Sequence, residues 1–246
     1  MEKPFSGKKA LVIGGTGGIG RAVAIVLAGK GAELTVHGGS SRERLESTLN
    51  VVRGSGAKGE GFLLSVDKPE SVPSAIEEIL AHSPQTDILV CAWGPFKQGS
   101  IGELNGEFWQ SMVTGNLIFP GILVSRVLRG MMERNWGRIL LFGGTNTDTI
   151  RGFTTTAAYS AAKTALGVLA KSVAKSCGSR GITCNVLCPG LTETEYTQKE
   201  QKLYNLGKSP GGKPLNPRQI AIAAIAILEN PCINGAVVTA DQGLVL

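Results

Sequence analysis

The chain of 246 residues is 42% hydrophobic and 18% charged, and its net charge is +6 with an isoelectric point near 9.1. This length is sufficient to bury an apolar core without disulfides or metals. The Lys and Arg residues are dispersed and do not alternate with aromatic residues, which argues against nucleic-acid binding. The positive charge instead favours anionic ligands, such as a phosphorylated cofactor or an acidic carrier.

The five cysteines are odd in number and accompany no recognisable signal peptide, which indicates reduced thiols rather than a disulfide framework. Cys184 and Cys188 have no histidine near them in the sequence, so we expect buried strand residues and no metal site. The apolar run at residues 220–228 is much shorter than the roughly 20 residues of a membrane-spanning helix. We therefore expect a cytoplasmic protein that does not enter a membrane.

Short β-type runs alternate with longer helical patterns along the whole chain. Strands are predicted at residues 9–13, 33–37, 58–65, 87–91, 137–142, 183–187 and 237–240. Helices are predicted at residues 20–29, 42–53, 71–82, 108–134, 159–177 and 217–228. This alternation predicts an α/β fold, a doubly wound Rossmann-type parallel sheet of about seven strands with helices on both faces. We expect one domain over residues 1–246, with a substrate lid at about 191–215.

The first predicted strand leads directly into a glycine-rich turn, and a predicted helix follows it. Glycines at such a turn let the backbone approach a diphosphate closely, and the helix N-terminus offers free N–H groups. The strand–turn–helix setting makes the motif a better indicator of dinucleotide binding than glycines alone. The predicted contact residues are Gly14, Thr16, Gly17, Gly18, Ile19 and Gly20.

The spacing Gly14-x-x-x-Gly18-Ile19-Gly20 resembles that of the short-chain dehydrogenase/reductase family, and the resemblance extends over essentially the whole chain. Tyr159-x-x-x-Lys163 is similar to the family's catalytic pair, and Asn116 to its active-site asparagine. Residues 185–190, 233–235 and 241–243 resemble the strand-end and closing motifs. Together these motifs stand in the family's order, and the chain most resembles the 3-oxoacyl-acyl-carrier-protein reductase branch.

The residues after the second strand predict a preference for NADP(H) over NAD(H). No carboxylate is present there to bind the ribose hydroxyls, whereas Ser40, Ser41, Arg42 and also Arg21 offer partners for a 2′-phosphate. Arg44 is interpreted as a residue of a solvated helix face. By resemblance, further cofactor contacts fall on Ser65, Val66, Cys91, Ala92, Gly94, Tyr159, Lys163, Pro189, Gly190, Leu191 and Thr192. Cys91-Ala92-Trp93 replaces the family's Asn-Asn-Ala before Gly94, which changes the wall of the cofactor site.

The resemblance implies hydride transfer between nicotinamide and a carbonyl or secondary alcohol. Tyr159 would act as the general acid or base, but the pKa of a free tyrosine is about 10. Lys163 lies one helical turn later on the same face, and its charge is expected to lower the pKa of Tyr159. Asn116 would support a water that relays protons to Lys163.

The family's catalytic serine is absent, because its position falls on Gly144 when the sequences are aligned at Gly137-Arg138-Ile139. Thr145 carries the same kind of hydroxyl and is the predicted replacement, with Asn146 and Thr147 as alternatives. The interval from Thr145 to Tyr159 is one residue longer than the family's usual spacing, which an insertion within residues 146–156 would explain. A threonine here can equally cap a turn.

The expected substrate is a small-molecule or acyl-thioester carbonyl compound, carried in the second case by an acyl carrier protein. Arg129 and Arg180 match basic positions by which that branch meets its acidic carrier. The predicted helices at 108–134 and 159–177 carry extensive apolar surface, and the resemblance implies that they form a dimer contact within a homotetramer. Another function stays open, that of a degenerate relative which binds NADP(H) as a sensor or scaffold without turnover. The missing serine favours this alternative, and the retained Tyr159, Lys163 and Asn116 favour the enzyme.

Overall fold

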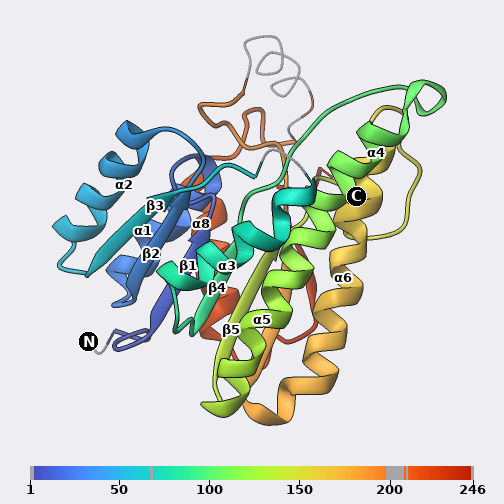
Figure 1. The fold of residues 1–246 in the computed structure, drawn as a ribbon. Coiled ribbons are helices and arrows are strands. Elements are labelled where there is room, and N and C mark those ends of the chain that lie inside the picture. Colours follow the sequence, from blue (N-terminus) through green and yellow to red (C-terminus); the bar gives the residue numbers. More distant parts are fainter. Residues whose placement is uncertain (1–2, 67–68, 198–207, 209, 245–246) are drawn as a thin grey trace.

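A seven-stranded parallel sheet forms the centre of the molecule (Figure 1). The computed structural model describes residues 3–66, 69–197, 208 and 210–244. The strand order is β3-β2-β1-β4-β5-β6-β7, and every pairing is parallel. The strands are β1 (Lys9–Ile13), β2 (Glu33–Gly38), β3 (Gly59–Leu63), β4 (Ile88–Cys91), β5 (Gly137–Phe142), β6 (Ile182–Pro189) and β7 (Val237–Ala240). The predicted fold class is thus confirmed.

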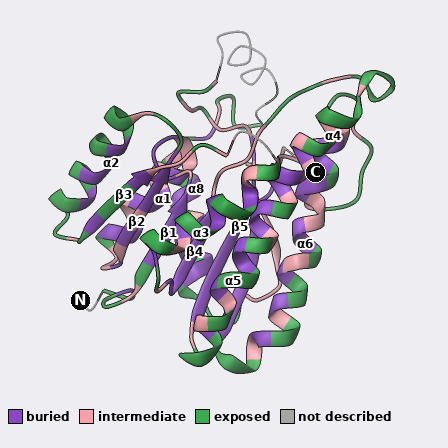
Figure 2. Ribbon diagram, in the orientation of Figure 1, coloured by how far each residue is buried: buried purple, intermediate pink, exposed green. Residues whose placement is uncertain are grey.

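Helices cover both faces of the sheet, because the central strands are apolar on both sides. One core cluster packs the sheet against α1 (Gly18–Gly29), α2 (Arg42–Gly54) and α8 (Pro217–Glu229). The other packs it against α3 (Val72–His82), α5 (Phe119–Glu133) and α6 (Ala157–Cys177), and α4 (Gly106–Val113) adjoins α6. Short 3-10 turns lie at Pro69–Ser71, Ile101–Glu103 and Gly178–Arg180. Figure 2 shows the buried residues concentrated in the strands and on the inner faces of the helices.

The helix predicted at residues 108–134 is interrupted. A π-helical segment at Thr114–Ile118 separates α4 from α5, and it contains Asn116. Two side chains explain the interruption: Pro120 has no N–H to donate, and the Asn116 amide donates to the Met112 carbonyl within the helix. The expectation of one regular helix was therefore wrong, and the deviation falls on a predicted site residue.

The combined helix Gly106–Glu133 is long and apolar enough to cross a membrane by length and composition alone. Half of its most apolar window is buried inside the protein, which is typical of a core helix in a soluble fold. Its buried side chains include Phe119, Leu123 and Met131, which belong to the core cluster of the α5 face. The helix is therefore a layer of the fold.

The strand order reverses direction between β1 and β4. The chain leaves β1 toward β2 and β3 on one side, then crosses to β4, β5, β6 and β7 on the other. In open α/β sheets, ligands bind at the carboxyl ends of the strands beside such a reversal. The glycine-rich turn and most of the predicted site residues follow the carboxyl ends of β1, β4, β5 and β6.

Candidate functional site

The glycine-rich turn after β1 has the backbone conformation that the sequence predicted. Gly14 and Gly18 both have positive φ angles, 75° and 51°, which side chains disfavour. A Cβ at Gly20 would collide with the Gly14 carbonyl, so the third glycine lets the helix approach the turn. Helix α1 begins at Gly18 after Gly17, which has no side chain to cap the first N–H groups. N–H donors at such a helix end suit an anionic group.

His37 fixes the base of this turn and was missed as a site residue in the sequence analysis. Its ring is buried; Nε2 donates to the Leu64 carbonyl at 2.8 Å, and Nδ1 accepts from the Gly14 N–H at 3.3 Å. Burial lowers the pKa of His37 and favours the neutral ring, which both hydrogen bonds require. His37 thus joins the turn to the end of β3, where Ser65 and Val66 follow. A histidine ending a buried strand was the only signal in the sequence.

Cys91 and Trp93 form the wall of the site at the end of β4. Burial raises the pKa of the Cys91 thiol to about 12, so it is neutral at physiological pH. The Trp93 ring packs edge-on against Phe119 with centroids 5.3 Å apart, and its backbone lies against Gly14. The Ala92 N–H donates to the Ile13 carbonyl at 3.0 Å. The altered wall is therefore well packed against the glycine-rich turn.

Tyr159 and Lys163 lie one turn apart near the start of α6. The Lys163 side chain is buried, and its ammonium donates to the Phe142 carbonyl at 2.9 Å and lies 5.9 Å from the centroid of the Tyr159 ring. Burial lowers the pKa of Lys163 to about 8. Burial also raises the pKa of Tyr159 to about 12, with a smaller contribution from Cys188. The expected lowering of the tyrosine pKa is thus not observed, because desolvation of the hydroxyl dominates.

Asn116 is fully buried and is held by two backbone carbonyls. Its amide nitrogen donates to the Pro95 carbonyl at 2.8 Å and to the Met112 carbonyl at 2.9 Å. Its Oδ1 atom is buried and has no hydrogen-bond partner among the described residues. This oxygen lies against Gly94, where a Cβ would collide with it and would lie 3.4 Å from Lys163 Nζ. The arrangement brings an available acceptor close to the lysine.

Gly144 lies beside the Tyr159 hydroxyl. A Cβ on Gly144 would lie 2.9 Å from Tyr159 Oη and 2.8 Å from its ring carbon Cε1. The Thr145 hydroxyl donates to the Pro189 carbonyl at 3.0 Å, and the Thr147 hydroxyl bonds both backbone groups of Gly144. Asn146 has a positive φ of 64°, and its buried Oδ1 has no described partner. Thr145 stays a prediction, with its hydroxyl proton engaged elsewhere in this structure.

The predicted contacts after β6 form a compact strand end. The Gly190 N–H donates to the Ala240 carbonyl at 3.0 Å, and the Gly190 Cα packs against Asp241. Thr192 donates its hydroxyl proton to the Gly190 carbonyl and pairs with Leu215 in a short bridge next to Leu191. Of the predicted lid at 191–215, residues 198–207 and 209 lie outside the described residues.

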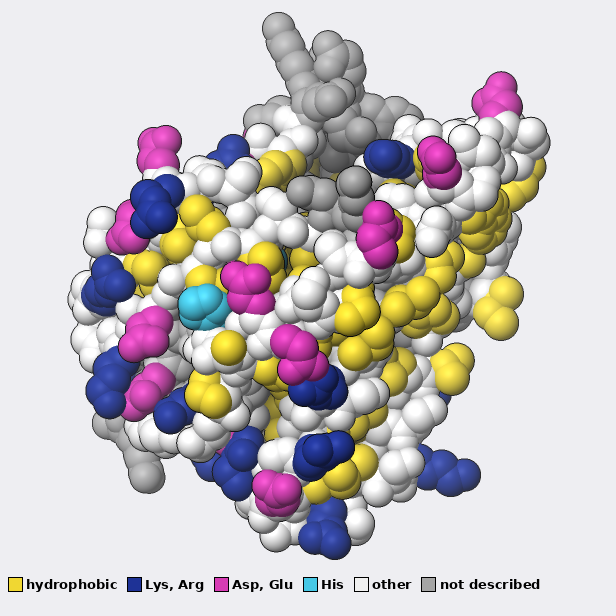
Figure 3. Space-filling model, viewed as in Figure 1, with side chains coloured by type: hydrophobic (Ala, Val, Ile, Leu, Met, Phe, Trp, Pro, Cys, Tyr) yellow, Lys and Arg dark blue, Asp and Glu magenta, His cyan; other side chains and the backbone are white. Residues whose placement is uncertain are grey.

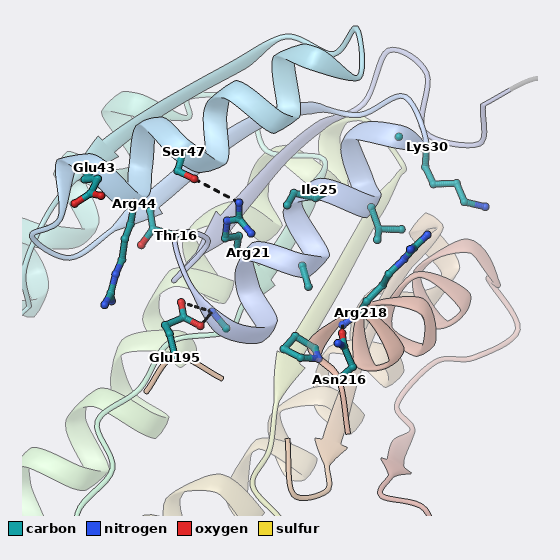
Figure 4. A pocket seen from close by; sticks show the side chains of 15 residues that line it. Thr16, Arg21, Ile25, Lys30, Glu43, Arg44, Ser47, Glu195, Asn216 and Arg218 are labelled. Atoms are coloured by element: carbon teal, nitrogen blue, oxygen red, sulfur yellow. Dashed lines mark hydrogen bonds between the residues drawn. The ribbon is translucent and has the colours of Figure 1, made fainter. Parts of the chain in front are cut away.

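A groove of about 1100 Å³ runs along the outer side of α1, between α2 and the start of α8 (Figure 4). Four cationic side chains line it, from Arg21, Lys30, Arg44 and Arg218. Arg44, interpreted from the sequence as a solvated residue, is thus part of the groove, and Arg42 is not among its lining residues. Ser41 caps α2 by accepting from the Arg44 N–H, and Ser40 is exposed. The groove begins beside Thr16 and Gly18, so Arg21, in the first turn of α1, lies close to the glycine-rich turn, whereas Lys30 lies at the other end of the helix.

The short chain dehydrogenase family profile matches residues 8–205, which is most of the chain. The protein belongs to the short-chain dehydrogenase/reductase family. It is therefore an oxidoreductase of that family, and Tyr159, Lys163 and Asn116 stand together in the structure at the edge where such proteins bind ligands.

Several members of this family are similar to the chain over most of its length. It is 34% identical over 245 residues to the 3-oxoacyl-[acyl-carrier-protein] reductase FabG of Escherichia coli, covering 98% of both chains. It is 35% identical over 230 residues to the protein of that name from Vibrio cholerae, covering 92% and 91%. A solved short-chain dehydrogenase/reductase from Serratia marcescens has a TM-score of 0.86 at 27% identity, with 99% of this chain and 100% of the other covered.

Proposed function

We propose that the protein is an NADPH-dependent carbonyl reductase that acts on 3-oxoacyl thioesters. The observation that carries the proposal is the juxtaposition of three groups at the carboxyl ends of β4 and β5. The Asn116 oxygen lies against Gly94, the Lys163 ammonium lies beside the same glycine, and Tyr159 lies one turn before Lys163. A protein that only bound dinucleotide would have no need of this proton-handling arrangement.

The residues present fit a dinucleotide phosphate cofactor. The glycines of the turn leave room where side chains would collide, and the first N–H groups of α1 are uncapped by the preceding residue. Cationic side chains at Arg21 and Arg44 lie beside the turn, and we assign the 2′-phosphate to this region together with Ser40, Ser41 and Arg42. Ser65, Val66 and the strand end at residues 189–192 would complete the binding site.

The reduced nicotinamide, when bound, supplies the hydride that converts the carbonyl into an alkoxide. Tyr159 then gives its hydroxyl proton to that oxygen, which leaves an alcohol and a tyrosinate. A tyrosinate forms more easily beside a positive charge, so Lys163 favours the step in its protonated form. The free oxygen of Asn116 can hold a water that returns a proton through Lys163 to Tyr159.

The missing serine changes how the substrate oxygen is held. Gly144 provides space next to the Tyr159 hydroxyl but no donor. Thr145 is one residue away, and we propose that rotation of its hydroxyl from the Pro189 carbonyl supplies the second hydrogen bond. Asn146 and Thr147 remain the alternatives.

The substrate class is proposed from the relatives, whose names specify 3-oxoacyl groups on an acyl carrier protein. The basic charge of the chain suits an acidic carrier in the cytoplasm. Arg129 and Arg180 are exposed, but they lie toward the amino ends of β5 and β6, opposite to Tyr159. A carrier bound by them would therefore serve the site of another copy of the chain.

The outer surface of the π-helical segment, α5 and α6 is suited to contacts between several copies of the chain. Exposed apolar side chains lie there at Ile118, Ile122, Met132 and Val168. Figure 3 shows a continuous band of hydrophobic side chains over the region of α4 and α5. Such a surface is typical of a protein–protein interface, and we propose a homotetramer.

Replacement of Tyr159 by phenylalanine tests the reductase directly. Tyr159→Phe should bind NADPH like the wild type but lose about 10²- to 10⁴-fold in the rate of NADPH oxidation, the usual contribution of a general acid. The measurement is NADPH absorbance with short 3-oxoacyl thioesters and simple ketones, alongside NADPH and NADH titrations. Tight binding without turnover of any carbonyl by the wild type would instead indicate a sensor. No dinucleotide binding at all would contradict both functions.

A further inference from the structure

The start of α1 is contacted by a carboxylate from a distant part of the chain. Both oxygens of Glu195 accept from the Gly18 N–H, at 2.9 and 3.1 Å, although the two residues lie 177 positions apart. Figure 4 shows this side chain reaching from the segment after β6 to the first turn of the helix. The carboxylate thus bonds a donor that a dinucleotide diphosphate would use.

The segment at residues 192–197 is built to hold Glu195 there. Its backbone bonds Leu215 at one end, and Thr194 and Thr197 close a turn around Glu195. The Tyr196 ring covers the space beside Gly17, where a Cβ would collide with both Tyr196 and Glu195. The guanidinium of Arg44 lies 5.0 Å from the centroid of that ring. The glycine-rich turn is therefore covered by a hydrogen-bonded segment.

We propose that Glu195 is an internal competitor of the cofactor, which must displace the carboxylate from Gly18 in order to bind. A diphosphate and a carboxylate cannot share one N–H donor, and their like charges repel at this distance. This inference rests on the proposed NADPH-dependent function. It predicts that the affinity for the cofactor is set partly by residues 192–197, which continue directly from the predicted cofactor contacts at the end of β6.

The competition has a consequence that a merely structural role would lack. A carboxylate at a helix N-terminus stabilises the helix, so its removal should destabilise the protein measured without cofactor. The same removal should strengthen cofactor binding, because the competing group is gone. A side chain that only supported the fold would change both quantities in the same unfavourable direction.

The experiment compares Glu195→Gln and Glu195→Ala with wild type in titrations with NADPH and NADH, and in thermal unfolding without ligand. Both variants should bind both cofactors about two- to fivefold more tightly. Glu195→Ala should also lower the melting temperature by about 1–3 °C. Glu43→Gln is the matched control, because Glu43 lines the same groove from the first turn of α2.

The outcomes separate this inference from the proposed function. Unchanged or weaker binding by both Glu195 variants, with tight binding by wild type, would overturn the competitor and leave the reductase intact. An equal gain in cofactor affinity in Glu43→Gln would also overturn it, because the gain would then follow from the loss of any negative charge in the groove. Binding by the Glu195 variants but not by wild type would support it strongly. Failure of every variant to bind either cofactor would contradict the proposed function itself.

Discussion

The two sides of the candidate site are held in place in opposite ways. On the Tyr159 side, Lys163 and Asn116 are buried and donate to backbone carbonyls of Phe142, Pro95 and Met112. On the side of the glycine-rich turn, buried His37 holds Gly14 from below, but the side chains that cover Gly17 and Gly18 are Glu195 and Tyr196. Both are exposed, as is Arg44, which lies over the Tyr196 ring. Buried groups hold a geometry that chemistry needs, whereas exposed groups can exchange with a ligand. In the proposed function, the Tyr159 side is therefore preorganised for the chemistry, whereas the side of the glycine-rich turn would admit the cofactor by displacement of Glu195.

The largest expected effect concerns buried Lys163, and it appears in the pH dependence of the reduction rate. Burial lowers the pKa of Lys163 to about 8, so the lysine loses its proton above that pH. Since the protonated lysine favours transfer of the Tyr159 proton, reduction should be constant below about pH 8. Above that pH it should fall about tenfold per pH unit. The measurement is kcat/KM for the carbonyl substrate, with NADPH saturating, between pH 6 and 10.

Two variants of Lys163 complete this test. Below pH 8, Lys163→Ala should be about 100-fold or more slower than the wild type, because no cation remains beside Tyr159, and its rate should show no decline near pH 8. Lys163→Arg retains the charge at high pH, so its lower activity should show no decline near pH 8. If the wild-type rate stays constant up to pH 10, the role assigned to the Lys163 proton is wrong.

A smaller effect on the rate is expected from substitutions of Gly144, which stands on the Tyr159 side at the position of the family's serine. A Cβ here would lie 2.8 Å from Tyr159 Cε1, which is too close for unstrained contact. Gly144→Ala should therefore displace the tyrosine and lower kcat about tenfold, while NADPH affinity stays at the wild-type value. Gly144→Ser should also lose activity in spite of its new hydroxyl. A gain in the serine variant would show that the tyrosine adapts.

The sequence predicts the layers of this fold well because its signals are local. Short apolar runs predicted β1, β5 and β7 with the bounds that the structure shows. The glycine-rich turn also has positive φ angles at Gly14 and Gly18, as its glycines allow. The interruption of the long helix was missed, since Asn116 bonds Met112 only when the helix is formed. Glu195 was missed for a different reason: nothing in the sequence around it indicates a contact 177 positions away.

The smallest effect is expected at Arg44 and would distinguish phosphate recognition from displacement. Arg44 lines the groove beside Thr16 and also lies over Tyr196, so its removal acts on the cofactor in two ways. Loss of a partner for the 2′-phosphate should weaken NADPH binding about threefold relative to NADH, as is usual for an exposed ion pair. The release of Tyr196 should strengthen the binding of NADPH and NADH equally, so it does not change the ratio of their dissociation constants. Titrations of Arg44→Ala and Arg42→Ala with both cofactors measure this ratio. If only Arg42→Ala changes the ratio of the NADPH and NADH affinities, the 2′-phosphate is bound by Arg42, as the sequence predicted. Arg44 would then act only through its contact with Tyr196.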